Sequence, residues 1–354
     1  MSILSEKTSI PDPKQNSVFL RAYRGERTDH TPVWIYRQAG RYLPEYRKLK
    51  GSTPSLEFFK NPDMAAQAAV DAQRILGTDA AILFADLLPV LEPLGFDLDY
   101  IPGSGPHIAN PFRGQPFRRF AGAGAEEALG YIRDTVRNTI SELPGDIPLI
   151  GFAGAPFTLA SYASEGESSK TFAQTKRLMF SNETAWHAFL SDLVDLVTTY
   201  VDMQVSAGVD AIQIFDSWAG CLSAGNYRRF AMPHTQRLMH RITGRVPVIY
   251  FGTGNSHMFS DLPSTGADLL AVDWRAPLVE SWEQLGCVAI QGNLDPALLL
   301  TDFDIVRRYT HELLASVARR PGHIFNLGHG VLPQTPVDNV QRLVALVQHS
   351  TSGR

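Results

Sequence analysis

Short apolar runs alternate with helical patterns along most of the chain. Three runs share one phrase, a helix end followed by a turn and a buried strand: LGTDAAILF at 76–84, AGVDAIQIF at 207–215 and TGADLLAVDW at 265–274. Gly77, Gly208 and Gly266 suit the left-handed position that ends a helix. The apolar residues that follow do not alternate with polar ones, which is typical of parallel strands covered on both faces.

The segments before these phrases have the spacing of amphipathic helices. Asn61 and Pro62 are typical of the N-cap and the first position of a helix. Apolar residues then recur on one face, at Ala65, Ala69, Ala72 and Leu76. The stretch 182–207 repeats this pattern with Trp186, Phe189, Leu190, Leu193 and Val197.

Five further apolar runs bring the number of predicted strands to eight. They are VWIY at 33–36, PLIGF at 148–152, VPVIYF at 246–251, VAIQG at 288–292 and HIFNL at 323–327. Eight parallel strands with helical crossovers predict an α/β protein with a single (β/α)8 TIM-type barrel. An open doubly wound sheet is the alternative, but no dinucleotide fingerprint or P-loop follows the first strand.

No linker-like stretch divides the chain. We therefore expect a flexible N-terminal segment at 1–16 and one barrel domain at 17–349, followed by the tail HSTSGR. A length of 354 residues is within the range of single-domain barrels, and 44% hydrophobic residues are enough to form a core.

Charge and cysteine content narrow the partners and the compartment. A sequence pI near 6.2 argues against nucleic acid as a partner. Cys221 and Cys287 are the only cysteines, too few for a disulfide framework, which suits a reducing compartment and predicts a cytoplasmic protein. The N-terminus has charges and prolines where a signal peptide has its apolar core, and no stretch resembles a membrane span.

In a barrel the chemistry lies at the carboxyl ends of the strands. The residues that follow the eight runs in turn are Arg37, Gln38 and Arg41; Asp86; Tyr162; Asp216 and Ser217; Thr253; Asp273 and Arg275; Asn293; and His329. Cations and hydroxyls dominate this set, and it includes neither the metal-binding spacing HExxH nor the Gly-x-Ser-x-Gly elbow. The set predicts a site for a polyanionic organic molecule and no metal.

Each residue also has a purely structural interpretation. Arg37 and Arg41 could be surface charges beside a turn, and Asp86 could cap the following segment, since Asp is a favoured N-cap. His329 could be a core histidine, or its Gly-flanked loop could bind phosphate. Tyr162 could be packing, and Asp273 is expected to be architectural, paired with Arg275 or a neighbouring loop.

Four motifs resemble the uroporphyrinogen decarboxylase family over nearly the whole chain. They are RQAGRYLPEYR with the preceding VW, GFAGAPFTLASY at 151–162, FDSWAG at 215–220 and NLGHGVLPQTPVDNV at 326–340. Three departures concern the pocket lining and a loop. Tyr36 replaces the family's usual Met, Phe157 its usual Trp, and ASEGESS its typical MIEGGSS.

The resemblance implies a (β/α)8 barrel, usually a homodimer, that converts uroporphyrinogen III into coproporphyrinogen III by removing carbon dioxide from four acetate side chains. The small-molecule substrate carries eight carboxylates, which guanidinium groups bind through forked hydrogen bonds. The family pattern assigns substrate contacts to Arg37, Gln38, Ala39, Gly40, Arg41, Asp86, Tyr162, Phe215, Ser217 and His329. The same resemblance implies a place in haem or chlorophyll synthesis.

The implied chemistry needs no cofactor. Protonation of a pyrrole carbon makes the substrate's own ring the electron sink for decarboxylation. Asp86 matches the family's aspartate, which accepts hydrogen bonds from the pyrrole N–H groups and stabilises the cationic intermediate. Arg37 is the family's favoured proton donor, but a guanidinium with a pKa above about 12 is a poor acid, so water and His329 are alternatives.

Two other functions fit parts of the pattern. Related barrels transfer methyl groups between corrinoids and thiols with a zinc held by Cys and His, but the last strand and its loop, NLGHGVLP, carry no cysteine. A non-catalytic tetrapyrrole carrier would share the arginines without the reaction.

Overall fold

The computed structural model describes residues 13–101, 103–115, 123–317 and 320–352. Seven parallel strands form one curled sheet: β1 (Ala81–Ile82), β4 (Leu149–Gly154), β5 (Ala211–Asp216), β6 (Val248–Gly252), β7 (Leu269–Ala271), β8 (Ile290–Leu294) and β9 (His323–Leu327). Each strand pairs with the next one in this order, and Phe215 is the one residue among them that is partly exposed. The expectation of strands covered on both faces is therefore confirmed.

The eighth predicted strand is reduced to a bridge that closes the ring. Val33 pairs in parallel with Phe325 of β9, and its carbonyl accepts a hydrogen bond of 2.9 Å from the backbone N–H of Asp79, two residues before β1. The segment at 33–36 thus lies between the two edges of the sheet. The barrel is confirmed, but the prediction of a four-residue first strand is wrong.

Side-chain oxygens accept hydrogen bonds from the backbone N–H groups that a longer first strand would have paired with its neighbours. The N–H of Ile35 donates to Oε1 of Gln38 at 3.3 Å, and the N–H of Tyr36 donates to Oδ1 of Asn326 at 3.0 Å. The Gln38 N–H donates to the Ile35 carbonyl, so the chain has already turned there. The strand pattern ends early because these polar residues replace the ladder.

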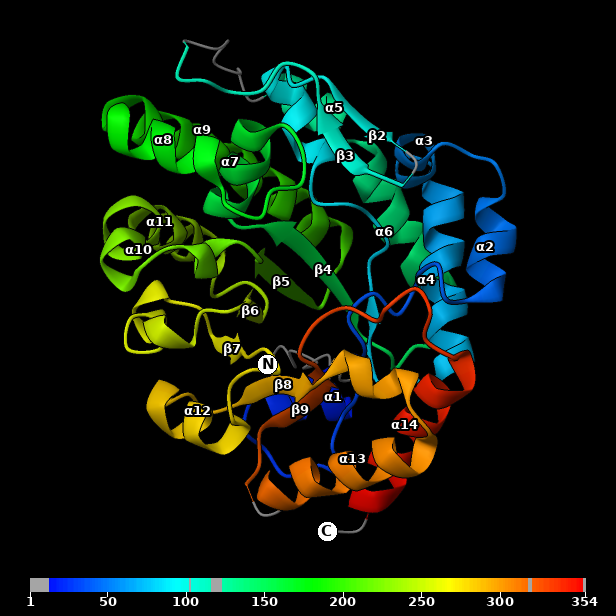
Figure 1. The fold of residues 1–354 in the computed structure, drawn as a ribbon. Coiled ribbons are helices and arrows are strands. Elements are labelled where there is room, and N and C mark those ends of the chain that lie inside the picture. The colour runs from blue at the N-terminus through cyan, green and yellow to red at the C-terminus, as the bar shows by residue number, and fades with distance from the viewer. Residues whose placement is uncertain (1–12, 102, 116–122, 318–319, 353–354) are drawn as a thin grey trace, which may run out of the picture.

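A ring of helices surrounds the sheet (Figure 1). Its members are α4 (Pro62–Leu76), α6 (Tyr131–Glu142), α9 (Glu183–Ala207), α11 (Met232–Ile242), α12 (Leu278–Leu285), α13 (Phe303–Val317) and α14 (Val337–Thr351). The last helix packs against the first, so the outer layer also closes. The predicted end of α4 is confirmed, because Asn61 caps it through Met64 N and Gly77 adopts the left-handed conformation at its C-terminus.

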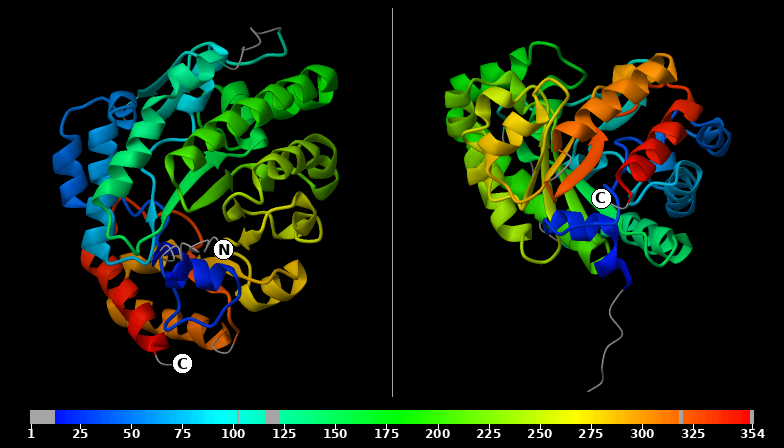
Figure 2. Two further views of the ribbon diagram at one scale, coloured as in Figure 1. Left: turned by 180° about the vertical axis from the view of Figure 1, so that it is seen from behind. Right: turned by 90° about the horizontal axis from the view of Figure 1, so that it is seen from below.

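The N-terminal segment covers the amino ends of the strands. Helices η1 (Pro13–Asn16) and α1 (Val18–Tyr23) lie there, behind the ring as seen in Figure 1 and in front of it in the left view of Figure 2. Lys14 forms an ion pair of 3.1 Å with Asp210, which directly precedes β5. Of the expected flexible segment 1–16, residues 1–12 lie outside the described part of the chain, and 13–16 form η1.

The connections at the opposite end of the barrel build the surroundings of the site. The first includes α2 (Pro44–Lys50) and α3 (Ser55–Phe59), and the second includes η2 (Pro89–Leu94), an antiparallel hairpin of β2 (Leu98–Ile101) and β3 (Gly105–Ile108), and α5 (Ala123–Ala128). After β4 come α7 (Pro156–Glu165) and α8 (Ala173–Ser181), and after β5 come η3 (Ala219–Cys221) and α10 (Ala224–Phe230). Short helices η4 (Ser256–Met258), η5 (Leu262–Thr265) and η6 (Pro296–Leu300) complete the later connections.

Within the described residues, no helix is both long and apolar enough to cross a membrane. Cys221 and Cys287 are both unpaired and partly buried.

Candidate active site

The turn after the first barrel segment places Arg37 in an uncommon backbone conformation. Its φ is 61°, in the left-handed region that residues other than glycine rarely adopt. Gln38 fixes the turn from inside, because its buried side chain accepts from Ile35 N and donates to the Ala80 carbonyl. The side chain of Arg37 itself is exposed. A strained residue held by its neighbours is a common feature of functional sites.

Electrostatic coupling shows what surrounds the Arg37 guanidinium. Its positive charge lowers the pKa values of Asp86, Tyr162 and His329, although burial is the largest influence on each of them. The three residues follow β1, β4 and β9 respectively. The structure therefore brings together four of the predicted site residues from four different parts of the barrel.

Asp86 lies in the segment that follows β1, which ends at Ile82, and is partly buried. Its Oδ1 atom accepts a hydrogen bond of 3.0 Å from Leu88 N and one of 2.5 Å from the hydroxyl of Tyr100. Burial raises the pKa of Asp86 above its ordinary value, and the Tyr100 bond, the Leu88 N–H and the charge of Arg37 oppose that rise. The bond to Leu88 is the local turn expected of a structural aspartate, while the bond to Tyr100 is not.

Tyr100 is a residue of this site that the sequence reading missed. It lies in β2, opposite Pro106 of β3, and its ring meets that of Phe59 edge-on at 5.3 Å. The stretch FDLDYIPGSGPHI alternates apolar and polar residues around a Gly- and Pro-rich turn, which is the pattern of a hairpin. That signal could have predicted β2 and β3, but it does not say where the Tyr100 hydroxyl points.

Tyr162 lies in the second half of α7 and packs against the loop after β5. Its ring meets that of Trp218 edge-on at 5.6 Å. Burial and the negative charge of Asp86 raise the pKa of Tyr162 to about 12, so its hydroxyl is protonated at neutral pH. Trp218 is held in turn by a hydrogen bond of 3.2 Å from its backbone N–H to Oγ1 of Thr158, which lies in α7.

Asp216, the last residue of β5, holds the start of the loop that follows β5. It is fully buried, and its two carboxylate oxygens accept from Thr158 Oγ1 and from the Tyr250 hydroxyl, each at 2.7 Å. Burial raises the pKa of Asp216 to about 6. Ser217 follows directly and is partly exposed, with its backbone carbonyl accepting from Thr253 Oγ1 at 2.6 Å.

An aromatic cluster lies at the carboxyl ends of the neighbouring strands. The ring of Phe215 lies 5.6 Å from that of Tyr36 and 6.0 Å from that of Phe251. Tyr36 stands where the family usually has Met, and its buried hydroxyl accepts a hydrogen bond of 2.5 Å from Gln291 Nε2. This bond satisfies the added hydroxyl inside the barrel, so the surroundings of Phe215 stay apolar.

His329 follows β9 and lies beside Trp274, which Arg275 covers. The ring of His329 meets Trp274 edge-on at 5.9 Å, while Arg275 stacks over Trp274 with its guanidinium carbon 3.8 Å from the ring centre. Burial, with the charge of Arg37 second, lowers the pKa of His329. Asp273 is 3% exposed and binds both Arg275, at 2.6 Å, and the N–H of Gly254. Its expected architectural role is confirmed.

The remaining predicted residues are placed less centrally. Ala39 is buried, Gly40 is partly exposed, and the Gln38 side chain is used within the protein. Arg41 is exposed, and its charge acts on Tyr46. Asn293 is buried and donates to the carbonyls of Asp273 and Ala276, which is a structural role.

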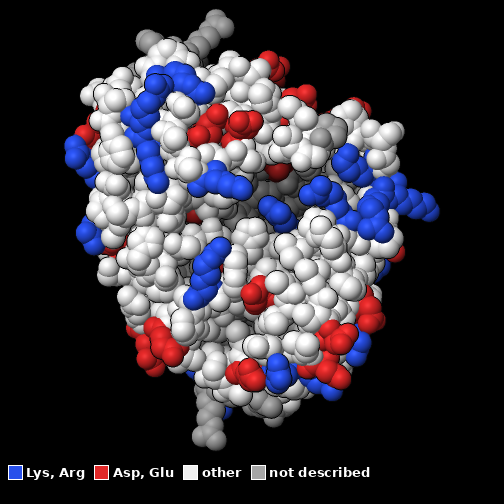
Figure 3. Space-filling model, viewed as in Figure 1, with Lys and Arg blue, Asp and Glu red and all other residues white. Residues whose placement is uncertain are grey.

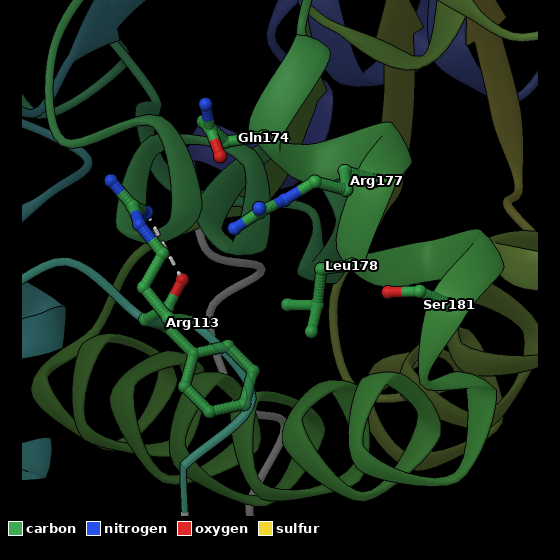
Figure 4. A pocket seen from close by; sticks show the side chains of 6 residues that line it. Arg113, Gln174, Arg177, Leu178 and Ser181 are labelled. Carbon is green, nitrogen blue, oxygen red and sulfur yellow. Dashed lines mark hydrogen bonds between the residues drawn. The ribbon is translucent and has the colours of Figure 1, made fainter.

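The face at the carboxyl ends of the strands is hollowed near its centre. Figure 3 shows Lys and Arg side chains around this hollow, in agreement with a site for an anionic ligand. A separate cavity of about 230 Å³ is lined by Phe112, Arg113, Gln174, Arg177, Leu178 and Ser181 (Figure 4). It contains none of the predicted site residues, and Arg113 there donates to the carbonyl of Ser164 in α7. Cavity shape alone therefore does not identify the site.

The described residues include no group of three or more His, Cys, Asp or Glu side chains placed to hold a metal ion. The chemistry that this arrangement supports is recognition of anions by Arg37 and Arg41, with one carboxylate, Asp86, available for a cation or a row of N–H donors.

Comparison with known proteins identifies the family of the chain. Residues 14–350 match the family model of uroporphyrinogen decarboxylase (URO-D). The chain is 45% identical over 335 residues to a uroporphyrinogen decarboxylase of Solibacter usitatus, covering 94% of this chain and 97% of that protein. It is 46% identical over 337 residues to one of Chloroflexus aggregans, covering 93% of this chain and 94% of that protein. A solved methyltransferase of Methanosarcina mazei superposes with a TM-score of 0.79 at 20% identity, over 95% of this chain and 98% of that one, and supports the fold alone.

Proposed function

The chain belongs to the uroporphyrinogen decarboxylase family, and we propose that it decarboxylates the four acetate side chains of uroporphyrinogen III with Asp86 and Arg37 as its catalytic residues. The products are coproporphyrinogen III and carbon dioxide, in tetrapyrrole synthesis. Family membership supports the reaction. The observation that supports the assignment of residues is the position of Asp86, whose carboxylate stands within electrostatic range of Arg37 at the carboxyl end of β1.

The substrate's chemistry explains what Asp86 has to do. A proton added to the pyrrole α-carbon next to the carbon that carries the acetate arm makes the ring cationic. The bond between the methylene of the arm and its carboxylate then breaks, its electron pair forms an exocyclic double bond to the ring, and carbon dioxide leaves. Protonation of that methylene and loss of the proton first added to the ring give the methyl group of the product and restore the pyrrole. A carboxylate that accepts the pyrrole N–H hydrogen bonds is most effective once the ring is positive, so it lowers the barrier more than it strengthens substrate binding.

The other site residues are assigned to substrate binding. We propose direct contacts from Arg37, Gln38, Ala39, Gly40, Arg41, Tyr162, Phe215, Ser217 and His329. Arg37 and Arg41 bind carboxylates, since a guanidinium stays charged and presents paired donors. Because the side chain of Gln38 is engaged with Ile35 and Ala80, its contact with substrate would come from the backbone. Tyr162 and Ser217 supply hydroxyls, and Phe215 supplies apolar surface under the macrocycle.

An anaerobic assay tests this function directly. Purified protein is incubated with uroporphyrinogen III, and the hepta-, hexa-, penta- and tetracarboxylate products are separated after oxidation. Ordered appearance of the four products supports the enzyme. Tight binding without product would instead identify a tetrapyrrole carrier. No specific observation favours the zinc-dependent methyl-transfer alternative, because the described residues offer no metal-binding group of three.

We propose three further properties of the protein. The family resemblance supports a homodimer, and light scattering on the purified protein tests this oligomeric state. A cytoplasmic location is supported by two unpaired cysteines, which a reducing compartment preserves, and cell fractionation tests it. Nucleic acid is not expected as a partner, since the formal net charge is −4.

A further inference from the structure

Two hydrogen bonds to the carboxylate of Asp86 end on the same oxygen, and the Leu87 N–H is a further backbone donor to this carboxylate. Both of the hydrogen bonds that it accepts from Tyr100 Oη and Leu88 N end on Oδ1, at 2.5 and 3.0 Å. Two donors on one oxygen fix both the position and the plane of a carboxylate group. The second oxygen, Oδ2, is used by neither bond.

Tyr100 is suited to this task because it can act only as a donor towards Asp86. Burial and the negative charge of Asp86 raise the pKa of Tyr100 far above its ordinary value, so the hydroxyl keeps its proton throughout the working range. Its ring is positioned by the hairpin of β2 and β3 and by the edge-on contact with Phe59. The hairpin is thus the part of the fold that delivers the second donor.

We propose that Tyr100 is a positioning residue for decarboxylation: its hydroxyl occupies Oδ1 of Asp86, so that Oδ2 is presented to the pyrrole N–H groups of the substrate. This inference rests on the proposed function of Asp86. A hydrogen bond to an ionised oxygen also favours the ionised form. Tyr100 therefore keeps Asp86 negative at lower pH than burial alone would allow.

A merely structural role would look different. If the hydroxyl only satisfied a polar group in a partly buried place, its removal would change stability and leave turnover unchanged at every pH. If it acts through Asp86, its removal matters only while the Asp86 carboxylate is present. These alternatives are separated by a double-mutant cycle.

The experiment compares wild type, Tyr100→Phe, Asp86→Asn and the double variant in the anaerobic uroporphyrinogen assay. Tyr131→Phe is the matched control, because Asp86 also raises the pKa of Tyr131, but among the described residues Tyr131 makes no hydrogen bond to Asp86. We expect kcat of Tyr100→Phe to fall about tenfold or more, the range for a hydrogen bond to a charged group, with KM changed less than about threefold. Tyr131→Phe should stay within about twofold of wild type.

Two readouts are specific to action through Asp86. On the Asp86→Asn background, Tyr100→Phe should lower kcat by less than about twofold. The acid side of the kcat profile of Tyr100→Phe should lie at higher pH than that of wild type, because the lost hydrogen bond no longer opposes the raised pKa of Asp86. Thermal unfolding of each variant confirms that it is folded, and Phe keeps the ring that packs on Phe59.

Unchanged kcat and an unchanged pH profile in Tyr100→Phe would overturn the inference while leaving the decarboxylase assignment intact. An equal loss on both backgrounds, or a loss confined to KM, would also overturn it. If wild type itself released no product, the proposed function would fail first, and the inference would fall with it.

Discussion

The side chain of Arg37 lies directly against Gly330. A β-carbon at position 330 would stand 2.8 Å from Cγ of Arg37 and closer still to its Cδ. Gly330 follows His329 in the loop after β9, so the absence of a side chain there lets Arg37 lie across that loop, beside the histidine. The turn after the first barrel segment and the loop after the last strand therefore pack against each other at the site.

Gly330→Ala should displace Arg37 while leaving the fold intact, because a flexible arginine side chain can move away at little cost. We expect kcat/KM for uroporphyrinogen to fall by about tenfold or more, as for loss of a charged hydrogen bond, with thermal stability nearly unchanged. Gly225→Ala is the control, because no atom lies near a β-carbon there and the position is helical. Wild-type kinetics in Gly330→Ala would show that Arg37 tolerates the displacement.

Much of this architecture can be predicted from local sequence patterns, because helix ends and buried strands have characteristic residues. Gly77 and Gly208 end helices in the left-handed conformation, as their place before buried apolar runs predicts. The capped start of α4 at Asn61 was equally predictable. Continuous apolar runs identified the strands, and the rule that barrel chemistry follows the strands led to Arg37, Asp86 and His329.

The features that the sequence did not predict depend on contacts between distant segments. Whether the first strand extends beyond Val33 is decided by Asn326, which is 290 positions from Tyr36 and takes its N–H. The partnership of Tyr100 with Asp86 depends on how the hairpin of β2 and β3 lies beside the segment that follows β1. A periodicity describes which face is buried, but it does not describe which side chain meets which across the site.

Arg37→Ala and Arg41→Ala should both weaken substrate use, but unequally. Arg37 is within electrostatic range of Asp86, Tyr162 and His329, whereas Arg41 acts on Tyr46. We expect about a hundredfold loss of kcat/KM for Arg37→Ala and about three- to tenfold for Arg41→Ala. Arg37→Lys, which keeps the charge but loses the fork, should recover only part of the loss. If all three variants kept wild-type kinetics, Arg37 and Arg41 would be solvent-exposed turn residues with no role in substrate binding.

Asp216 gives the protein a pH-dependent stability. Its folded pKa of about 6 lies above the ordinary value of 3.8, so the folded state holds the proton more tightly than the unfolded chain. The resulting stabilisation is complete below about pH 4 and is lost as pH rises through about 6, which amounts to about 3 kcal/mol at ~1.4 kcal/mol per pH unit. Asp216→Asn lacks this titration. Urea unfolding at pH 4, 5, 6 and 7 should show wild type losing stability relative to the variant, and a constant difference would contradict it.

Asp86→Asn is the sharpest test of the mechanism, because it is nearly isosteric and removes the charge while keeping one acceptor oxygen. The amide oxygen can still accept from Tyr100 and Leu88, so the local fold should survive. Asp295→Asn is the matched control, since Asp295 Oδ1 makes the same local bond to the N–H two residues on, at 2.9 Å, as Asp86 makes to Leu88. If Asp86 were only a turn residue, both variants would keep wild-type rates.

If the carboxylate of Asp86 stabilises a pyrrolic cation, its loss should remove about 3–4 kcal/mol of transition-state stabilisation, or about two to three powers of ten in kcat. Affinity for the product coproporphyrinogen should fall less than kcat does, because full positive charge arises only after the ring is protonated. The measurement is kcat beside product affinity for folded Asp86→Asn and Asp295→Asn. A kcat near that of wild type in Asp86→Asn would defeat the proposed role, because turnover would then need neither the charge of Asp86 nor a second acceptor oxygen at this position.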